Sequence, residues 1–221
     1  MTKASKAGER HLYFVRHGMR VDFENPAWRE TADNPHDTPL SPTGLRQARD
    51  IARALRGEGI DHVFSSPFLR AVETAHPLAA ELGLPLRIET GLSEWLNPAW
   101  FKSPPRWMSV AEAATRFPQV DTGYVAAVQP DFPEPSETEH VFARVGRTLN
   151  VLLERYPEGN AVFFAHGASL AQGIAGLIGG LEGIDLRTAA ITRVVISEGQ
   201  ARLVASGSGH LRDEDSQVRF H

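Results

Sequence analysis

The sequence predicts an α/β protein, a three-layer α/β/α sandwich in which helices cover both faces of a mostly parallel central sheet. Two observations support this prediction. Short apolar runs, typical of buried strands, alternate along the chain with longer segments whose apolar residues recur at helical spacing. The chain has 221 residues, of which 42% are hydrophobic and 23% charged, so it is long enough for one well-buried domain.

Four apolar runs predict the parallel strands, and the segments between them supply the helices. The strands are expected at 12–15, 62–66, 86–89 and 161–165, followed by a closing hairpin of 193–197 and 201–205. Helices are expected at about 42–56, 67–82, 136–156 and 168–178. This order of elements is typical of βαβ units, whose strands run parallel.

Capping residues set the boundaries of the first two helices. Ser41 is a suitable N-cap for the first helix, which is expected to end at Gly57. The pair Ser66-Pro67 is a typical helix opening, with serine at the N-cap and proline at the first helical position. Pro77 lies inside the second helix, where proline removes a backbone donor, so we expect a kink or a break there.

The domain organisation is simple. Residues 1–10 are polar and are expected to form a disordered tail, and residues 11–221 to form a single domain. From 97 to 135 the hydrophobic pattern loosens, with one short helix expected at about 109–116. We interpret this stretch as an insertion that caps one end of the sheet.

Composition excludes several classes of protein. The net charge is −4 and no basic run is dense, so a nucleic-acid partner is not expected. No segment has the length of a membrane span or the apolar core of a signal peptide, which predicts a cytoplasmic protein without a membrane partner. Without cysteine there can be no disulfide, thiolate catalysis or Cys-ligated zinc. None of the nine histidines has His-x-His or His-Glu-x-x-His spacing, so neither a metal nor a cofactor is expected.

Reactive side chains follow each of the four predicted parallel strands. Arg16 and His17 follow the first strand, and Arg70 lies one turn into the helix after the second. Glu94 follows the third strand and His166 the fourth. Because the carboxyl ends of parallel strands meet at one edge of a sheet, these groups are expected to share a cleft.

The residue types in this set suit a phosphate ester. Guanidinium groups bind phosphate oxygens in bidentate fashion, so Arg16, Arg20 and Arg70 could hold a tetrahedral dianion. His166 precedes a helix, whose N-terminal amides also favour an anion. A metal would not be needed, because the three arginines already neutralise the phosphoryl charge.

The remaining two residues could carry the reaction. A neutral His17 with one free ring nitrogen can attack phosphorus in line. Glu94 is the only carboxyl group of the set, so it would protonate the leaving oxygen and later deprotonate water. Its apolar neighbours Leu92, Trp95 and Leu96 could supply the desolvation that such work requires.

Two short motifs and two longer segments carry a family resemblance. The motifs are Arg16-His17-Gly18 and His166-Gly167, and the segments are 40–48 and 65–75. They resemble, in the same order, the signatures of the histidine phosphatase superfamily, branch 1, which has the phosphoglycerate-mutase-like fold. The resemblance implies that His17 is the nucleophile, Glu94 the proton donor, and Arg16, Arg70 and His166 the phosphate pocket.

Within this superfamily, segments 16–22 and 91–95 are most similar to the phosphatase domain of the TULA/Sts proteins, which implies that Arg20 joins the phosphate pocket. Met19 stands where that group usually has glutamate, so substrate and regulation do not carry over. Mutases usually follow Arg-His-Gly with Glu-Ser, which is missing here. The acid phosphatase and phytase branch usually has His-Asp where this chain has His166-Gly167.

The leading hypothesis is a metal-independent phosphatase that hydrolyses a phosphomonoester through a phosphohistidine intermediate. Two alternatives stay open: a phosphoglycerate-mutase-type phosphotransferase, and a non-catalytic module that binds phosphorylated ligands. The substrate is then a phosphorylated small molecule or a phosphoprotein, and the resemblance makes a homodimer plausible. Trp28, Trp95 and Trp100 are expected to wall the approach, which would suit an aryl or other apolar ester; the alternative is that they pack beneath the loops.

Overall fold

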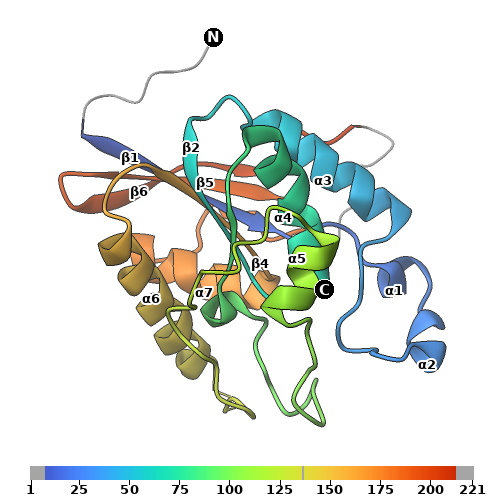
Figure 1. Ribbon diagram of the computed structural model, residues 1–221. Helices are drawn as coiled ribbons and strands as arrows, with labels where there is room; N and C mark the ends of the chain where they lie inside the picture. Colours follow the sequence, from blue (N-terminus) through green and yellow to red (C-terminus); the bar gives the residue numbers. More distant parts are fainter. Residues whose placement is uncertain (1–7, 136, 213–221) are drawn as a thin grey trace.

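A six-stranded sheet forms the centre of the protein, which we describe from a computed structural model over residues 8–135 and 137–212 (Figure 1). Its strands are β1 (Glu9–Arg16), β2 (Ile60–Ser65), β3 (Leu86–Ile88), β4 (Asn160–Ala165), β5 (Ile191–Ser197) and β6 (Gln200–Gly207). They lie in the order β3-β2-β4-β1-β5-β6. Strands β1 to β4 pair in parallel, and the β5–β6 hairpin adds two antiparallel strands beside β1. The predicted α/β sandwich with a mostly parallel sheet is confirmed.

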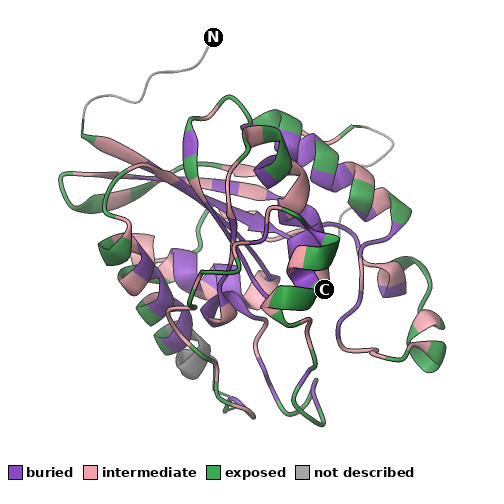
Figure 2. Ribbon diagram, in the orientation of Figure 1, coloured by how far each residue is buried: buried purple, intermediate pink, exposed green. Residues whose placement is uncertain are grey.

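Helices cover both faces of this sheet (Figure 1). They are α1 (Val21–Glu24), α2 (Trp28–Thr31), α3 (Pro42–Leu55), α4 (Leu69–Leu82), α5 (Val110–Arg116), α6 (Thr138–Arg155) and α7 (Gly167–Ile178), with one 3₁₀ turn, η1 (Thr90–Leu92). Successive strand residues point to opposite faces. Val15 and Phe164 therefore pack with α3 and α4, whereas Phe14 and Phe163 pack with α6 and α7. Figure 2 shows the resulting buried strands between half-exposed helices.

The amino end of β1 differs from the expectation of a tail through residue 10. Glu9 and Arg10 belong to β1, where they pair with Ser197 and Ile196 of β5. Both side chains are polar, so they do not extend the apolar run that predicted the strand. Their order comes from backbone pairing with a strand late in the chain. The rest of the expected tail, residues 1–7, lies outside the described residues.

Helix α4 also differs from expectation at its start and in its middle. It begins at Leu69, after an extended Phe68, and not at Ser66-Pro67. The Ser66 hydroxyl instead bonds Nε2 of His166 at 2.7 Å, a contact between residues far apart in the sequence. The helix also continues through Pro77 without a break, because buried residues on both sides of the proline anchor it in the core.

The first residues of α3 pack closely against the end of β1. Ser41 caps this helix as expected, and its hydroxyl accepts a hydrogen bond from the Gly44 amide at 3.1 Å. A side chain at Gly44 would overlap the carbonyl oxygen of Met19. Glycine at this position therefore lets the helix lie against the loop that leaves His17.

The segment 97–135 packs against the edge strand β3 and the start of α4. Its helix α5 begins after Ser109, which forms a capping box with Glu112. Val120 forms an isolated bridge with Leu86, and Phe101 joins a small cluster with Phe68. In the part of the chain that the structure describes, no helix is both long and apolar enough to cross a membrane.

Candidate active site

The strand register brings the two candidate histidines together. Arg16 at the end of β1 lies beside Ala165 at the end of β4, and the His17 amide donates to the Ala165 carbonyl oxygen at 3.0 Å. The next residue on each chain segment is a histidine. The rings of His17 and His166 consequently lie edge to face, with centroids 5.3 Å apart.

His17 is held as a neutral ring with a defined tautomer. Its Nδ1 lies 2.9 Å from the Gly18 carbonyl oxygen, which can only accept, so Nδ1 carries the hydrogen and Nε2 is left unprotonated. The residue is 1% exposed. Burial, and then the positive charges of Arg70, Arg16 and Arg20, hold the pKa of His17 well below its ordinary value.

His166 contacts three other segments of the chain. Its Nε2 bonds the Ser66 hydroxyl at 2.7 Å, and its Nδ1 lies 3.7 Å from Oε2 of Glu94. The Phe68 ring packs against it edge to face at 5.1 Å. Burial and the charge of Arg70 hold the pKa of His166 well below its ordinary value, so this ring is also neutral near neutral pH.

Arg16 and Arg70 are both buried beside the histidines. Arg16 Nη1 donates to the Leu186 carbonyl oxygen at 2.5 Å, and Gly167 leaves room for its guanidinium, since a Cβ there would lie 3.2 Å from Arg16 Cζ. The guanidinium of Arg70 stacks over the Phe68 ring at 4.4 Å. Burial and the charge of Arg20 lower the pKa of Arg70 to about 9, so Arg70 stays charged at neutral pH.

Arg20 is oriented by a carboxylate that sequence analysis missed. Asp22 accepts from Arg20 Nε at 2.9 Å and from Nη2 at 2.6 Å, and also from Arg29 Nε at 2.6 Å. The Phe23 ring lies under the Arg20 guanidinium at 4.2 Å. Burial acts to raise the pKa of Asp22, but the two arginines outweigh it and lower that pKa.

Glu94 reaches the histidines from the loop after η1. Its Oε1 accepts from the Trp95 amide at 3.0 Å, and its Oε2 is the oxygen near His166. Leu92 and Leu96 are buried beside it as expected, whereas Glu94 itself is half-buried. In its ionised form, Glu94 interacts favourably with both Arg16 and Arg70. The four strand ends therefore bring all the predicted phosphate-site residues to one place.

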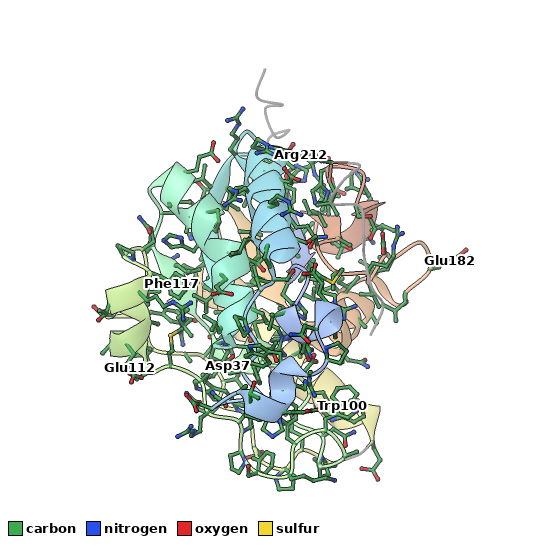
Figure 3. All side chains as sticks on the ribbon, turned by 90° about the vertical axis from the view of Figure 1, so that its right-hand side faces the viewer. Asp37, Trp100, Glu112, Phe117, Glu182 and Arg212 are labelled. Carbon is green, nitrogen blue, oxygen red and sulfur yellow. The ribbon has the colours of Figure 1, made fainter. Side chains whose placement is uncertain are left out.

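The expected tryptophan wall is assembled only in part. Trp95 and Trp100 meet edge to face at 5.4 Å, and Trp100, labelled in the lower half of Figure 3, is 53% exposed. Trp95 Nε1 donates to the Pro135 carbonyl oxygen, so this ring also packs on the loop. Trp28 lies in α2, and no ring contact joins it to the other two among the described residues.

The loop 25–39 and the 97–135 segment contact each other through residues other than the tryptophans. Asn34 Nδ2 donates to the Arg106 carbonyl oxygen at 2.6 Å, and the His36 ring contacts Phe101 at 5.2 Å. Asp37, labelled in Figure 3, accepts from the Leu69 amide at the start of α4. Burial raises the pKa of Asp37 to about 6. The loop 25–39 is thus packed against both α4 and the 97–135 segment.

Further residues of the site were not found by sequence reasoning. They are Ser66, Phe68, Asp22, Asp37, Glu134 and Arg144. Ser66 stood in a helix-capping pattern, and Asp22 lay two residues from Arg20, which was a weak local signal. Phe68 lay two residues from Arg70, which was an equally weak signal. Asp37, Glu134 and Arg144 come from more distant segments and carry no such signal. Over the ranges that the structure describes, no three His, Asp or Glu side chains converge as metal ligands.

A family model described as the histidine phosphatase superfamily (branch 1) matches residues 12–208. The chain belongs to this superfamily. It is 30% identical over 215 residues to the ecdysteroid-phosphate phosphatase of Drosophila melanogaster, and 33% identical over 200 residues to human ubiquitin-associated and SH3 domain-containing protein B. These matches cover 80% and 73% of this chain but only 28% and 30% of the relatives, so the chain spans less than a third of their length.

A solved structure shows the same fold. The crystal structure of ecdysone phosphate phosphatase from Bombix mori in complex with tungstate superposes with a TM-score of 0.69 and 22% sequence identity. The match covers 92% of this chain and 98% of that one. The fold expected from the family resemblance is therefore confirmed, and the human relative agrees with the similarity to the TULA/Sts group of histidine phosphatases.

The arrangement predicts how His17 titrates. Nearby cations disfavour the protonated ring, so replacing Arg70 by glutamine should raise the pKa of His17 toward its ordinary value. Histidine-ring NMR across acidic pH should show wild-type His17 neutral at pH values where the Arg70→Gln variant already becomes protonated. Arg49 lies on the exposed face of α3, so Arg49→Gln should leave the midpoint of the His17 titration unchanged. An unchanged or lowered midpoint in Arg70→Gln would contradict this electrostatic account.

Proposed function

We propose that this histidine phosphatase family member is a metal-independent phosphomonoesterase that works through phosphohistidine. The observation that carries the proposal is the neutral His17, whose Nδ1–H is held by the Gly18 carbonyl while Arg16, Arg20 and Arg70 place positive charge around it. An unprotonated Nε2 among three cations is suited to attack a phosphate ester that would otherwise repel a nucleophile.

In the first step Nε2 of His17 forms a bond to phosphorus, and the bond from phosphorus to the ester oxygen breaks. Glu94 gives its proton to that oxygen, so the alcohol leaves neutral. The three arginines and His166 bind the phosphoryl oxygens, where charge is spread in the transition state. The 3.7 Å separation of Glu94 Oε2 and His166 Nδ1 supports a carboxyl group at the edge of this anion pocket.

In the second step water replaces the alcohol. The ionised Glu94 takes a proton from water, and the resulting hydroxide bonds to phosphorus as the bond from phosphorus to Nε2 breaks. Inorganic phosphate leaves, and both His17 and Glu94 return to their starting protonation states. One carboxyl group thus serves as acid and then as base.

The substrate we propose is the phosphate ester of a bulky aryl or other apolar alcohol. Trp95 and the exposed Trp100 support this choice, because they lie on the same loop as Glu94 and offer apolar surface beside it. One relative is named for a steroid phosphate. We therefore favour a phosphorylated small molecule over a phosphoprotein as the substrate.

The test is hydrolysis of p-nitrophenyl phosphate in EDTA, with the protein denatured in alkali during turnover to preserve any phosphohistidine. We expect release of inorganic phosphate with the chelator present and phosphate on the protein that is stable to alkali and labile to acid. Phosphate transferred to added glycerol in preference to water would indicate a phosphotransferase. Inorganic phosphate that binds in calorimetry without any turnover of esters would indicate the binding module.

A further inference from the structure

The carboxyl group of Glu94 depends on its own backbone for its position. Its side chain accepts a local hydrogen bond, from the amide of the next residue, Trp95. A loop that bears a proton donor needs accurate placement, since a displacement of about 1 Å can cost about 10²-fold in rate. Whatever holds residues 91–96 therefore controls where this carboxyl group lies.

One side of this loop is held by Arg144 of α6, which is 2% exposed. Its Nη1 donates to the carbonyl oxygens of Gly91 at 2.8 Å and of Ser93 at 3.1 Å, and to the Ser93 hydroxyl at 3.1 Å. Its Nη2 donates to the carbonyl oxygen of Glu94 itself at 3.2 Å. A single guanidinium thus binds three backbone carbonyls of the loop.

The other side is held by Glu134, at the end of the 97–135 segment. Its carboxylate binds Arg144, with Nε–Oε1 at 2.6 Å and Nη2–Oε2 at 3.1 Å. The same Oε2 accepts from the Leu96 amide at 2.8 Å, and the Glu134 amide donates to the Leu96 carbonyl oxygen at 3.0 Å. Every charge-bearing atom of the pair is thereby bonded to the loop or to its partner.

Stability alone does not explain this pair. Its side chains are 3% and 5% exposed, and burying two charges costs desolvation that their attraction often fails to recover, so apolar pairs of similar size are often as stable. A planar guanidinium with five directed donors does, however, hold a backbone in one geometry better than an apolar side chain can.

We propose that Glu134 and Arg144 are positioning residues, which together hold the loop 91–96 so that Glu94 lies beside His166. This proposal rests on the proposed function, in which Glu94 is the general acid. It also assigns a task to the 97–135 segment, because this segment delivers Glu134 to the back of the loop. Neither residue of the pair touches the substrate.

The test compares two esters in variants of the pair. In Arg144→Met, kcat should fall by about ten- to hundredfold on an alkyl phosphate, whereas p-nitrophenyl phosphate, whose leaving group hardly needs a proton, should lose less than about threefold. Adding Arg144→Met to Glu94→Gln should cause no further loss on the alkyl ester, because the positioned group is already gone. If Arg144 had a purely structural role, Arg144→Met would lower kcat equally on both esters. It would also cause a further loss when added to Glu94→Gln.

Two further variants serve as controls, one for misfolding and one for the effect of removing an arginine elsewhere on α6. Arg144→Met leaves Glu134 buried without its cation, so the doubly apolar variant Glu134→Leu/Arg144→Met, which buries no unpaired charge, should show the same selective loss in a well-folded protein. Arg147→Met is the matched control: Arg147 is exposed one turn further along α6, on a cavity of about 170 Å³ behind the pair, and should retain full activity on both esters.

A crystal structure of Glu134→Leu/Arg144→Met separates this inference from the proposed function. We expect the loop 91–96 to shift and the Glu94 carboxyl group to move away from His166. A loop that keeps its wild-type position would overturn the positioning role, whatever the activity. A wild-type protein without activity on any ester would overturn the proposed function, and the position of the loop in this crystal would still decide the inference.

Discussion

Replacing His17 by alanine should abolish hydrolysis of phosphate esters, with a fall in kcat on the order of 10⁴-fold or more, the scale seen when a covalent nucleophile is removed. The neighbouring His166 is not placed to substitute for it, because its Nε2 is bonded to Ser66 and its Nδ1 lies near Glu94. The measurement is the steady-state rate on p-nitrophenyl phosphate with EDTA, together with phosphate incorporation into the protein.

Binding should survive this substitution better than turnover does. Arg16, Arg20 and Arg70 remain in His17→Ala, so inorganic phosphate should still bind in calorimetry. His62→Gln is the matched control, because His62 lies toward the opposite end of β2 and bonds the Glu158 carbonyl oxygen. Turnover that persists in His17→Ala would rule out His17 as the nucleophile. An equal loss in His62→Gln would show that the loss is not specific to His17.

Replacing Glu94 by glutamine should lower kcat far more on an alkyl phosphate than on p-nitrophenyl phosphate. Loss of a general acid costs about 10²- to 10⁴-fold where the leaving group needs a proton. The rate on an alkyl phosphate should therefore fall by that factor, whereas p-nitrophenyl phosphate, whose phenolate is a good leaving group, should lose far less. The measurement is kcat on both esters with the same protein preparation.

The control for Glu94→Gln is Glu182→Gln, an exposed residue labelled at the right-hand side of Figure 3, which should leave both rates unchanged. Glutamine keeps the size of the Glu94 side chain and its acceptor for the Trp95 amide, so the loop should hold its shape. Equal losses on the two esters would remove Glu94 from the role of proton donor and leave it a binding role only.

Much of the fold could be predicted because burial of strands leaves a simple pattern. The runs that became β1 and β4 are apolar on both faces, since helices cover both sides of the sheet. The failures have a common cause. Glu9 and Arg10 form an ordered strand because they pair with β5, nearly two hundred residues later in the sequence. Helix α4 begins later than expected, and the Ser66 hydroxyl, which the prediction used as a cap, is hydrogen-bonded to His166. Contacts at such separation leave no local signal in a sequence.

For the active site, the sequence by itself determined the chemistry: arginines, two histidines and one glutamate, each placed after a predicted parallel strand, where strand ends must meet. Only the tertiary structure decided the geometry. The register of Arg16 against Ala165 sets the spacing of the two rings, and the Gly18 carbonyl selects the tautomer of His17. The orientation of the other groups comes from hydrogen bonds and ion pairs, which depend on distances and angles that exist only once distant segments have packed together.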